Sequence, residues 1–149
     1  MLVLLPLFFA PVVQAKENVN PDNSSSYKVK RLKEKVTLIF KFSAKAKSAH
    51  LSKLLAKRMD ELTYIVENKK MFYFEKATLR YSATAGQLSE VIVAKSLKSE
   101  AGSAKEQMEA YIPQIEKLQE NFSSDSAEWR FLQDDINSLK IYIDKLTSI

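Results

Sequence analysis

The side chain with the widest chemical range in this sequence is its single histidine, His50. An imidazole can ligate a metal ion or change its charge near neutral pH. A metal-binding histidine on a helix needs a second ligand three or four residues further on, where this chain has Lys53 and Leu54. We therefore interpret His50 as a structural residue at the edge of the core. A metal or small-ligand site beside it stays a distant alternative.

Arg58 is a second polar residue of interest, because it interrupts a run of apolar residues at helical spacing. Leu55 and Leu62 stand on the same side of the predicted helix. One interpretation is a residue that binds an anion. We favour an ion pair with an acid on a neighbouring helix, with the stem of Arg58 packed on the two leucines, since buried charges are usually paired.

The paired carboxylates Asp60-Glu61 and Asp134-Asp135 do not suit acid–base catalysis. Adjacent residues of a helix point about 100° apart, so the two carboxylates of each pair diverge from any common substrate atom. The sequence also has no cysteine, glycine-rich phosphate loop, Ser/His/Asp set or Glu-x-x-His motif. We predict that the protein is not an enzyme, with no catalytic residue, metal or cofactor and no evident small-molecule substrate.

Positive charge is concentrated in the first half of the chain. Residues 28–58 hold eleven Lys and Arg against one acid, Glu34, whereas the chain from residue 59 onward holds eleven basic and fifteen acidic residues. Lysines near an anionic lipid or polymer surface contribute about 1 kcal/mol each. A solvated face is the plainer interpretation, and no aromatic residues interleave with the lysines for stacking on nucleic acid bases. The candidate contacts to an anionic surface are Lys30, Lys33, Lys41, Lys45, Lys47, Lys53 and Lys57.

The first fifteen residues have the pattern of a secretory signal peptide. Their apolar run, residues 2–13, is shorter than the roughly 20 apolar residues that span a bilayer, and it ends in Val13-Gln14-Ala15, which predicts cleavage after Ala15. Residues 16–26 are polar and predict a flexible leader. The sequence thus predicts an extracytoplasmic protein, secreted or in the cell envelope. No Lys or Arg precedes the apolar run, so a start further upstream would make this segment a membrane anchor.

Beyond residue 26 the spacing of apolar residues predicts helices, and two glycines and four prolines are too few for a turn-rich β protein. We predict an all-α fold, an antiparallel helical bundle of about five helices in one domain over residues 27–149. The predicted helices cover about residues 27–42, 44–67 and 71–99, then a helix from the capping box at residues 103–106 to a turn at 121–124, and a last helix from the capping box at residues 125–128.

Single residues are expected to mark the ends and contacts of these helices. Ser43 should cap the second helix, and Asn68 should end it in the left-handed conformation. Gly102 should end the third helix. Gly86, in the middle of that helix, predicts the close approach of a neighbouring helix or a kink. Pro113 lies inside the fourth helix and should bend it.

Each predicted helix carries one apolar stripe, and the stripes together should form the core. The last one has a 3-4-3-4-3 spacing typical of a coiled coil, which predicts an antiparallel hairpin with the helix before it. In chain order the stripes are Val29, Leu32, Val36, Ile39 and Phe40; Leu51, Leu54, Leu55, Leu62, Ile65 and Val66; Phe74, Ala77, Tyr81, Ala85, Leu88 and Ile92; Met108, Tyr111, Ile115, Leu118 and Phe122; Trp129, Leu132, Ile136, Leu139, Ile143 and Leu146.

Residues 21–66 resemble a known family, domain-of-unknown-function family 5667 of bacteria and archaea. The motifs that carry the resemblance are Pro21-Asp22, Ser26-Tyr27, Lys30 to Val36, Phe40, Phe42, His50-Leu51, Leu54, Ala56-Lys57-Arg58 and Glu61-Leu62. The chain departs from the family at one corner, where Ser43-Ala44 replace Asp-Pro. The resemblance implies a domain that follows an export signal or a membrane anchor, and the family has no established function.

These observations favour a non-enzymatic, exported helical bundle that acts as a protein-interaction module of the cell envelope, with an envelope protein as its partner. The alternative is a module that binds anionic lipid or wall polymer through a basic N-terminal helical hairpin, formed by the first two predicted helices. Nucleic acid is not an expected partner.

Overall fold

The structure, a computed structural model, describes residues 28–29, 32–33 and 43–149 of the chain. The predictions for residues 1–27, 30–31 and 34–42 lie outside the described residues. They concern the signal peptide with its cleavage site after Ala15, the leader, and the candidate contacts Lys30 and Lys41.

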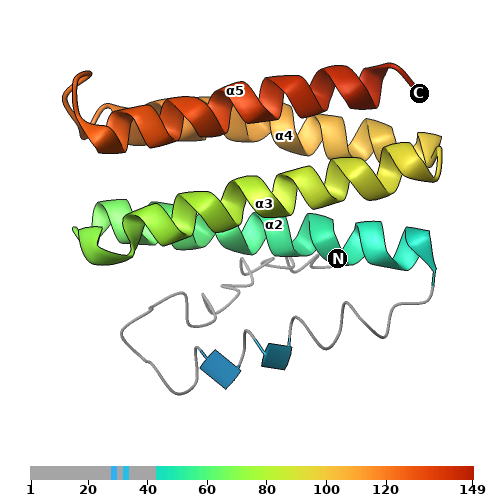
Figure 1. Cartoon of the computed structure of the whole chain (residues 1–149), viewed down its shortest axis with the longest axis horizontal. Coiled ribbons are helices and arrows are strands. Elements are labelled where there is room, and N and C mark those ends of the chain that lie inside the picture. Colours follow the sequence, from blue (N-terminus) through green and yellow to red (C-terminus); the bar gives the residue numbers. More distant parts are fainter. Residues whose placement is uncertain (1–27, 30–31, 34–42) are drawn as a thin grey trace, which may run out of the picture.

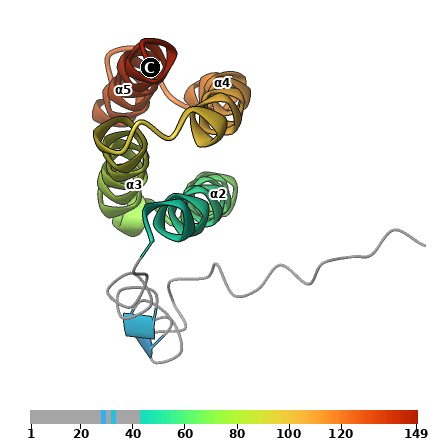
Figure 2. The ribbon, with the colours of Figure 1, turned by 90° about the vertical axis from the view of Figure 1, so that its right-hand side faces the viewer.

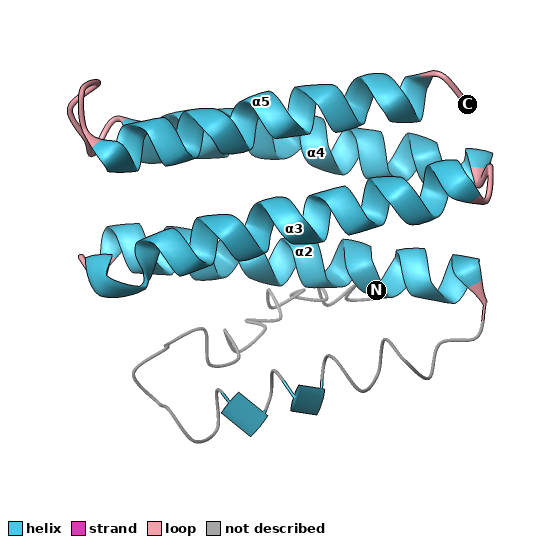
Figure 3. Cartoon of the chain, in the orientation of Figure 1, coloured by secondary structure: helices cyan, strands magenta, loops and turns pink. Residues whose placement is uncertain are grey.

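Most of the described part of the chain is helical, as the apolar spacing predicts. Short loops join the helices, and no strand occurs among the described residues (Figure 3). Within that same part, no helix has both the length and the apolar character needed to cross a bilayer. The elements are α2 (Ala44–Glu67), the one-turn 3-10 helix η1 (Met71–Tyr73), α3 (Phe74–Ala94), α4 (Lys98–Gln119) and α5 (Ala127–Thr147).

The four α-helices form two antiparallel hairpins, α2 with α3 and α4 with α5, which stack on each other (Figure 1). The hairpins meet mainly through α3 and α5, which lie side by side and run in the same direction. Figure 2, viewed along the helices, shows α2 and α4 on the other side of the bundle, and these two helices make few contacts with each other. The bundle is thus well packed along three sides and loosely packed along the fourth.

The apolar stripes of α2 and α3 form the core together with most of the stripes of α4 and α5. Leu51, Tyr81, Met108 and Leu139 are fully buried, one from each helix. Only the stripe residues Tyr111, Phe122, Trp129 and Ile143 are half-buried. The prediction that these stripes meet in one core is confirmed for the four described α-helices.

Of the first predicted helix, residues 28–29 and 32–33 are described, and they are helical. Val29 is 66% exposed and Leu32 is 64% exposed. The prediction that these two residues belong to the core is wrong. Apolar spacing identifies the apolar side of a helix, but it does not supply a neighbour that covers that side.

Two of the three helix starts predicted from capping residues needed correction. Ser43 caps α2 as predicted, since its hydroxyl oxygen accepts a hydrogen bond from the backbone N–H of Ala46 at 3.1 Å. The cap of α5 is Ser126, which accepts from the N–H of Trp129 at 3.1 Å, one residue beyond the predicted start. Ser103 caps nothing, because it lies inside α4.

The turn between α3 and α4 comes earlier in the chain than predicted. Ser96 adopts the left-handed conformation with φ 48°, and its N–H bonds to the carbonyl of Val93 while the N–H of Leu97 bonds to that of Ile92. This pair of bonds is the Schellman motif, which closes a helix. Gly102 therefore lies inside α4 instead of ending α3.

The end of α2 has the same motif one residue later than predicted. Lys69, with φ 55°, takes the left-handed position, and Asn68 does not, with φ −97°. The amide of Asn68 instead donates to the carbonyl of Tyr64 at 2.8 Å, so its polar side chain still satisfies the helix end.

Gly86 marks a close contact between helices, as predicted. A side-chain carbon at this position would lie 3.0 Å from the hydroxyl oxygen of Tyr142 on α5. The missing side chain thus makes room for the Tyr142 ring, which draws α5 close to α3.

Candidate functional site

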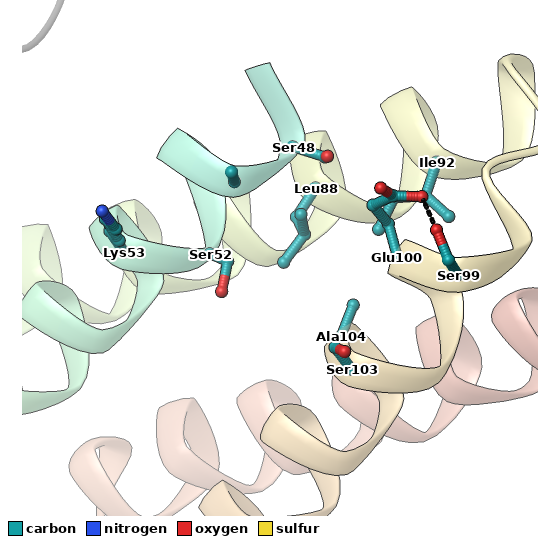
Figure 4. Close-up of a pocket in the computed structure, with 10 residues that line it drawn as sticks. Ser48, Ser52, Lys53, Leu88, Ile92, Ser99, Glu100, Ser103 and Ala104 are labelled. Atoms are coloured by element: carbon teal, nitrogen blue, oxygen red, sulfur yellow. Dashed lines mark hydrogen bonds between the residues drawn. The ribbon is translucent and has the colours of Figure 1, made fainter. Parts of the chain in front are cut away.

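The loosely packed side of the bundle contains a cavity of about 330 Å³, which we call the α2–α4 groove. Figure 4 shows its walls, formed by α2 and α4, with Leu88 and Ile92 of α3 at its floor. Most of the wall residues are small, and Lys53 and Glu100 add charge. The lining residues from the walls are Ser48, Ala49, Ser52, Lys53, Ser99, Glu100, Ser103 and Ala104.

The groove exists because small side chains face each other across it. Ser48 and Ser52 are one helical turn apart on α2, and Ser99 and Ser103 are one turn apart on α4. Residues at this spacing lie on one face of a helix. Helix axes that pack at about 8–10 Å need larger side chains to fill the space between them. The two walls therefore leave a channel above the apolar floor.

Polar contacts bridge the groove at two points. Gln107 of α4 accepts a hydrogen bond from the Ser52 hydroxyl at 2.7 Å and donates to the Ser52 carbonyl at 3.0 Å. It also donates to the Tyr111 hydroxyl at 3.1 Å, which fixes its orientation. Nearer the start of both helices, Lys45 forms an ion pair with Glu100 at 3.1 Å. A hydrogen bond from Ser99 and this ion pair lower the pKa of Glu100.

The serine hydroxyls of the α2 wall bond to a backbone carbonyl and to a side-chain amide. The buried hydroxyl of Ser48 donates to the carbonyl of Lys45 at 2.9 Å, and that of Ser52 donates to Gln107. Neither hydroxyl is thus hydrogen-bonded to a histidine or carboxylate that could take its proton, which nucleophilic catalysis requires. An apolar floor below hydroxyl groups can instead hold a ligand in one orientation.

His50, the first candidate from the sequence, lies on α2 outside the groove. It is half-buried, in agreement with a position at the edge of the core. Among the residues that the structure describes, no three His, Asp or Glu side chains gather in a way that could hold a metal ion.

Arg58 is buried and ion-paired, but its partner lies on its own helix. Its guanidinium group donates to Glu61 at 3.0 Å, three residues further along α2. The other oxygen of Glu61 accepts a hydrogen bond from Arg80 of α3. This ion pair lies within α2, whereas the prediction placed the acid on a neighbouring helix. The link between α2 and α3 runs through Glu61, and the i, i+3 spacing of Arg58 and Glu61 was the signal for it.

The described candidate lysines are exposed, and they do not form one cluster. Lys33 lies in the described part of the first predicted helix, and Lys45, Lys47, Lys53 and Lys57 lie on α2. Lys45 forms an ion pair with Glu100, and Lys53 lines the groove. Lys57 lies one helical turn beyond Lys53 on α2.

The structure brings out one buried acid that the sequence did not single out. Asp134 is exposed, whereas Asp135 is 2% exposed between α5 and α3. The expected divergence of adjacent carboxylates is thus confirmed here, as it is for exposed Asp60 and buried Glu61. The pKa of Asp135 is raised to about 7, mainly by burial. The hydrogen bond from Ser82 lowers this pKa, and the charge of Asp134 raises it further.

Comparison with known proteins gives one match. The model of a family described as Domain of unknown function (DUF5667) matches residues 18–140, which include α2, α3, α4 and most of α5. The match extends well beyond residues 21–66, which carry the resemblance in the sequence. No curated protein and no solved structure matches the chain.

Proposed function

We propose that this chain, which belongs to the family described as Domain of unknown function (DUF5667), is a non-enzymatic module that binds a helix of a partner protein in the α2–α4 groove. The single observation that carries this proposal is the cavity between the parallel helices α2 and α4, which make few contacts with each other. The proposed setting is the cell envelope, and the signal-peptide pattern of residues 1–15 supports it.

A helix fits the groove better than an extended peptide does. An amphipathic helix binds by laying one face into a groove between helices, whereas an extended peptide adds to the edge of a sheet. The serines of the two walls repeat every four residues, the spacing at which side chains line one face of a helix. Small walls let the backbone of a third helix come close to α2 and α4.

Charge complementarity sets the second feature of the partner helix. Lys53 at the groove and Lys57 one turn further along α2 are exposed, and neither has an ion-pair partner among the described residues. A partner helix with acidic residues along one flank would pair with them. The partner that we propose is therefore an amphipathic helix with small residues on its contact face and acidic residues on the flank that faces α2.

Site-specific photocrosslinking in the native host tests this proposal. A photoreactive amino acid at exposed Ser103 lies in the groove, and one at exposed Ala83 of α3 is the control outside it. We expect the Ser103 probe alone to crosslink a helical segment with small residues and an acidic flank. The variant Ala49→Trp fills the groove without removing a hydrogen bond and should abolish that adduct. Equal adducts from both probes, or adducts that survive Ala49→Trp, would contradict the proposal.

A second candidate function is binding to an anionic lipid or wall polymer, and the exposed positions of Lys47, Lys53 and Lys57 favour it. Such binding weakens as salt screens the charges. Sedimentation with anionic vesicles at low and high salt measures it, with neutral vesicles as the control. Binding that is lost in a triple Lys→Gln variant would support this candidate. No binding to anionic vesicles at low salt would remove it for lipid surfaces.

A further inference from the structure

Asp135 lies buried in the contact between the two hairpins, which we call the α3–α5 seam. The Ser82 hydroxyl of α3 donates a hydrogen bond to one carboxylate oxygen, Oδ1. The other oxygen, Oδ2, is buried and has no hydrogen-bond partner in the described part of the chain. A buried carboxylate oxygen without a partner is costly, and the cost is greatest when the group is charged.

The groups around Asp135 do not offset a negative charge. From α3, Tyr81 is fully buried, and its hydroxyl also has no hydrogen-bond partner among the described residues. From α4, the ring of Tyr111 lies 6.3 Å from that of Tyr81. On α5 itself, the adjacent acid Asp134 raises the pKa of Asp135 further. Asp135 has no ion pair with a basic side chain in the described residues, and α2 makes few contacts with α5.

A carboxyl group in such surroundings keeps its proton to a higher pH than usual. Burial raises the pKa of Asp135 to about 7 from an ordinary value of 3.8, despite the hydrogen bond from Ser82. Burial, and then the proximity of Asp135, raise the pKa of Tyr81, so this neighbour stays neutral. The seam thus accommodates the neutral form of Asp135 and opposes the charged form.

We propose that Asp135 is a proton-dependent lock on the α3–α5 seam, in which the neutral carboxyl group holds the two hairpins together and the ionised group loosens them. The α3–α5 contact is the main connection between hairpin α2–α3 and hairpin α4–α5. A loss of packing there therefore acts on the whole bundle, including the α2–α4 groove between the same hairpins.

The direction of the pH effect follows from the two pKa values. Between about pH 4 and pH 7 the folded chain holds a proton on Asp135 that the unfolded chain has released. Stability from this group is therefore fully present at low pH, falls as the pH rises through this window, and is constant above it. The difference of one proton corresponds to about a tenfold change in the unfolding equilibrium constant for each pH unit.

The test compares the pH dependence of unfolding of the full chain with that of the variant Asp135→Asn. Asparagine keeps an acceptor for Ser82 and cannot ionise. Relative to the variant, we expect the unfolding equilibrium constant of the natural chain to rise about tenfold per unit between about pH 5 and pH 7. The matched control is Asp134→Asn, which removes the adjacent exposed charge and should keep the slope of the natural chain.

Two further measurements on the natural chain do not depend on how the variant folds. Carbon-13 NMR of the Asp135 carboxyl group should show a titration near neutral pH. Hydrogen exchange of the backbone amides of α3 and α5, corrected for intrinsic rates, should become faster above pH 7 than at pH 5. A carboxyl titration near pH 4, or equal slopes for the natural chain and Asp135→Asn, would overturn the proposal.

Discussion

The same two hairpins meet along two sides of the bundle, and the two sides differ in how they are filled. At the α3–α5 seam, Gly86 faces Tyr142, so a missing side chain is matched by a large ring. At the α2–α4 groove, serines of both helices line a cavity of about 330 Å³. Small residues occur on both sides of the bundle. At the seam a large ring fills the space that Gly86 leaves, and at the groove small residues line an open space.

The polar contacts of the two sides differ in the same way. At the seam, the half-buried Ser82 hydroxyl donates to the carboxylate of Asp135, a residue that is itself buried. At the groove, the bridges from Ser52 to Gln107 and from Lys45 to Glu100 are partly exposed. Exposed bridges between few apolar contacts are typical of regions that open locally. We therefore infer that the α3–α5 seam holds the two hairpins together and that the α2–α4 groove is the side open to a ligand.

The largest expected effect lies in the closed part of the core. Leu139 of α5 is fully buried, so Leu139→Ala should lower the free energy of unfolding by about 2–5 kcal/mol. Urea unfolding followed by circular dichroism measures the change. The control is Ile141→Ala, because Ile141 is 54% exposed on the same helix and its loss should cost much less. Equal effects from both variants would show that α5 does not pack as described.

The next effect tests the contact between Gly86 and Tyr142 with a double-mutant cycle. Alanine in place of a helical glycine stabilises a helix by about 1 kcal/mol. In the natural chain Gly86→Ala should gain little, because the new carbon would meet the Tyr142 hydroxyl oxygen at 3.0 Å. In a Tyr142→Ala background it should gain the full amount. The same gain in both backgrounds, measured by urea unfolding, would mean that the ring does not pack against Gly86.

A smaller effect is expected at the groove. Gln107→Ala removes the hydrogen bonds to Ser52 and Tyr111 and should lower the free energy of unfolding by about 1 kcal/mol. Gln114→Ala is the control on the same helix, because the exposed Gln114 side chain bonds only to the carbonyl of Ala110 in the described residues. If Gln107→Ala lowered the free energy of unfolding as much as Leu139→Ala does, the groove would hold the hairpins together as strongly as the seam. That result would contradict the contrast between the two sides.

The smallest effect is expected at the ion pair of Lys45 with Glu100. The Lys45 side chain is 77% exposed, and exposed ion pairs contribute little to stability. Glu100→Gln should therefore leave the melting temperature unchanged within error, at low and at high salt. A clear decrease at low salt only would show that this bridge closes its end of the groove.

Much of the fold could be predicted from the sequence, because a helix in a bundle has one buried face and repeats it every 3.6 residues. The stripes from Leu51 to Leu146 were found in this way. The turn at Ser96 was not, because a serine in the left-handed conformation has no sequence signal, whereas Gly102 and Ser103 resemble a helix end and a cap. Local signals of turn residues misled where the tertiary structure placed the turn elsewhere.

The candidate site was less predictable than the fold. The α2–α4 groove is a relation between Ser52 and Ser103, residues of two helices whose distance no local pattern specifies. Asp135 was expected only to diverge from Asp134, and the position of α3 shows that it is the buried member of the pair. Arg58 was found because it interrupts a stripe. The pair with Glu61 was missed, although its i, i+3 spacing on α2 was the signal for it.

The contrast between an open and a closed side can be measured most directly with pairs of spin labels. The chain has no cysteine, so two introduced cysteines carry the labels specifically. One pair, at exposed Lys53 and Ser103, spans the groove, and another, at exposed Ala83 and Asn137, spans the seam. We expect electron–electron resonance to give a broad distance distribution across the groove and a narrow one across the seam at pH 5. Equally narrow distributions for both pairs would contradict the division of the bundle into a cohesive side and an accessible side.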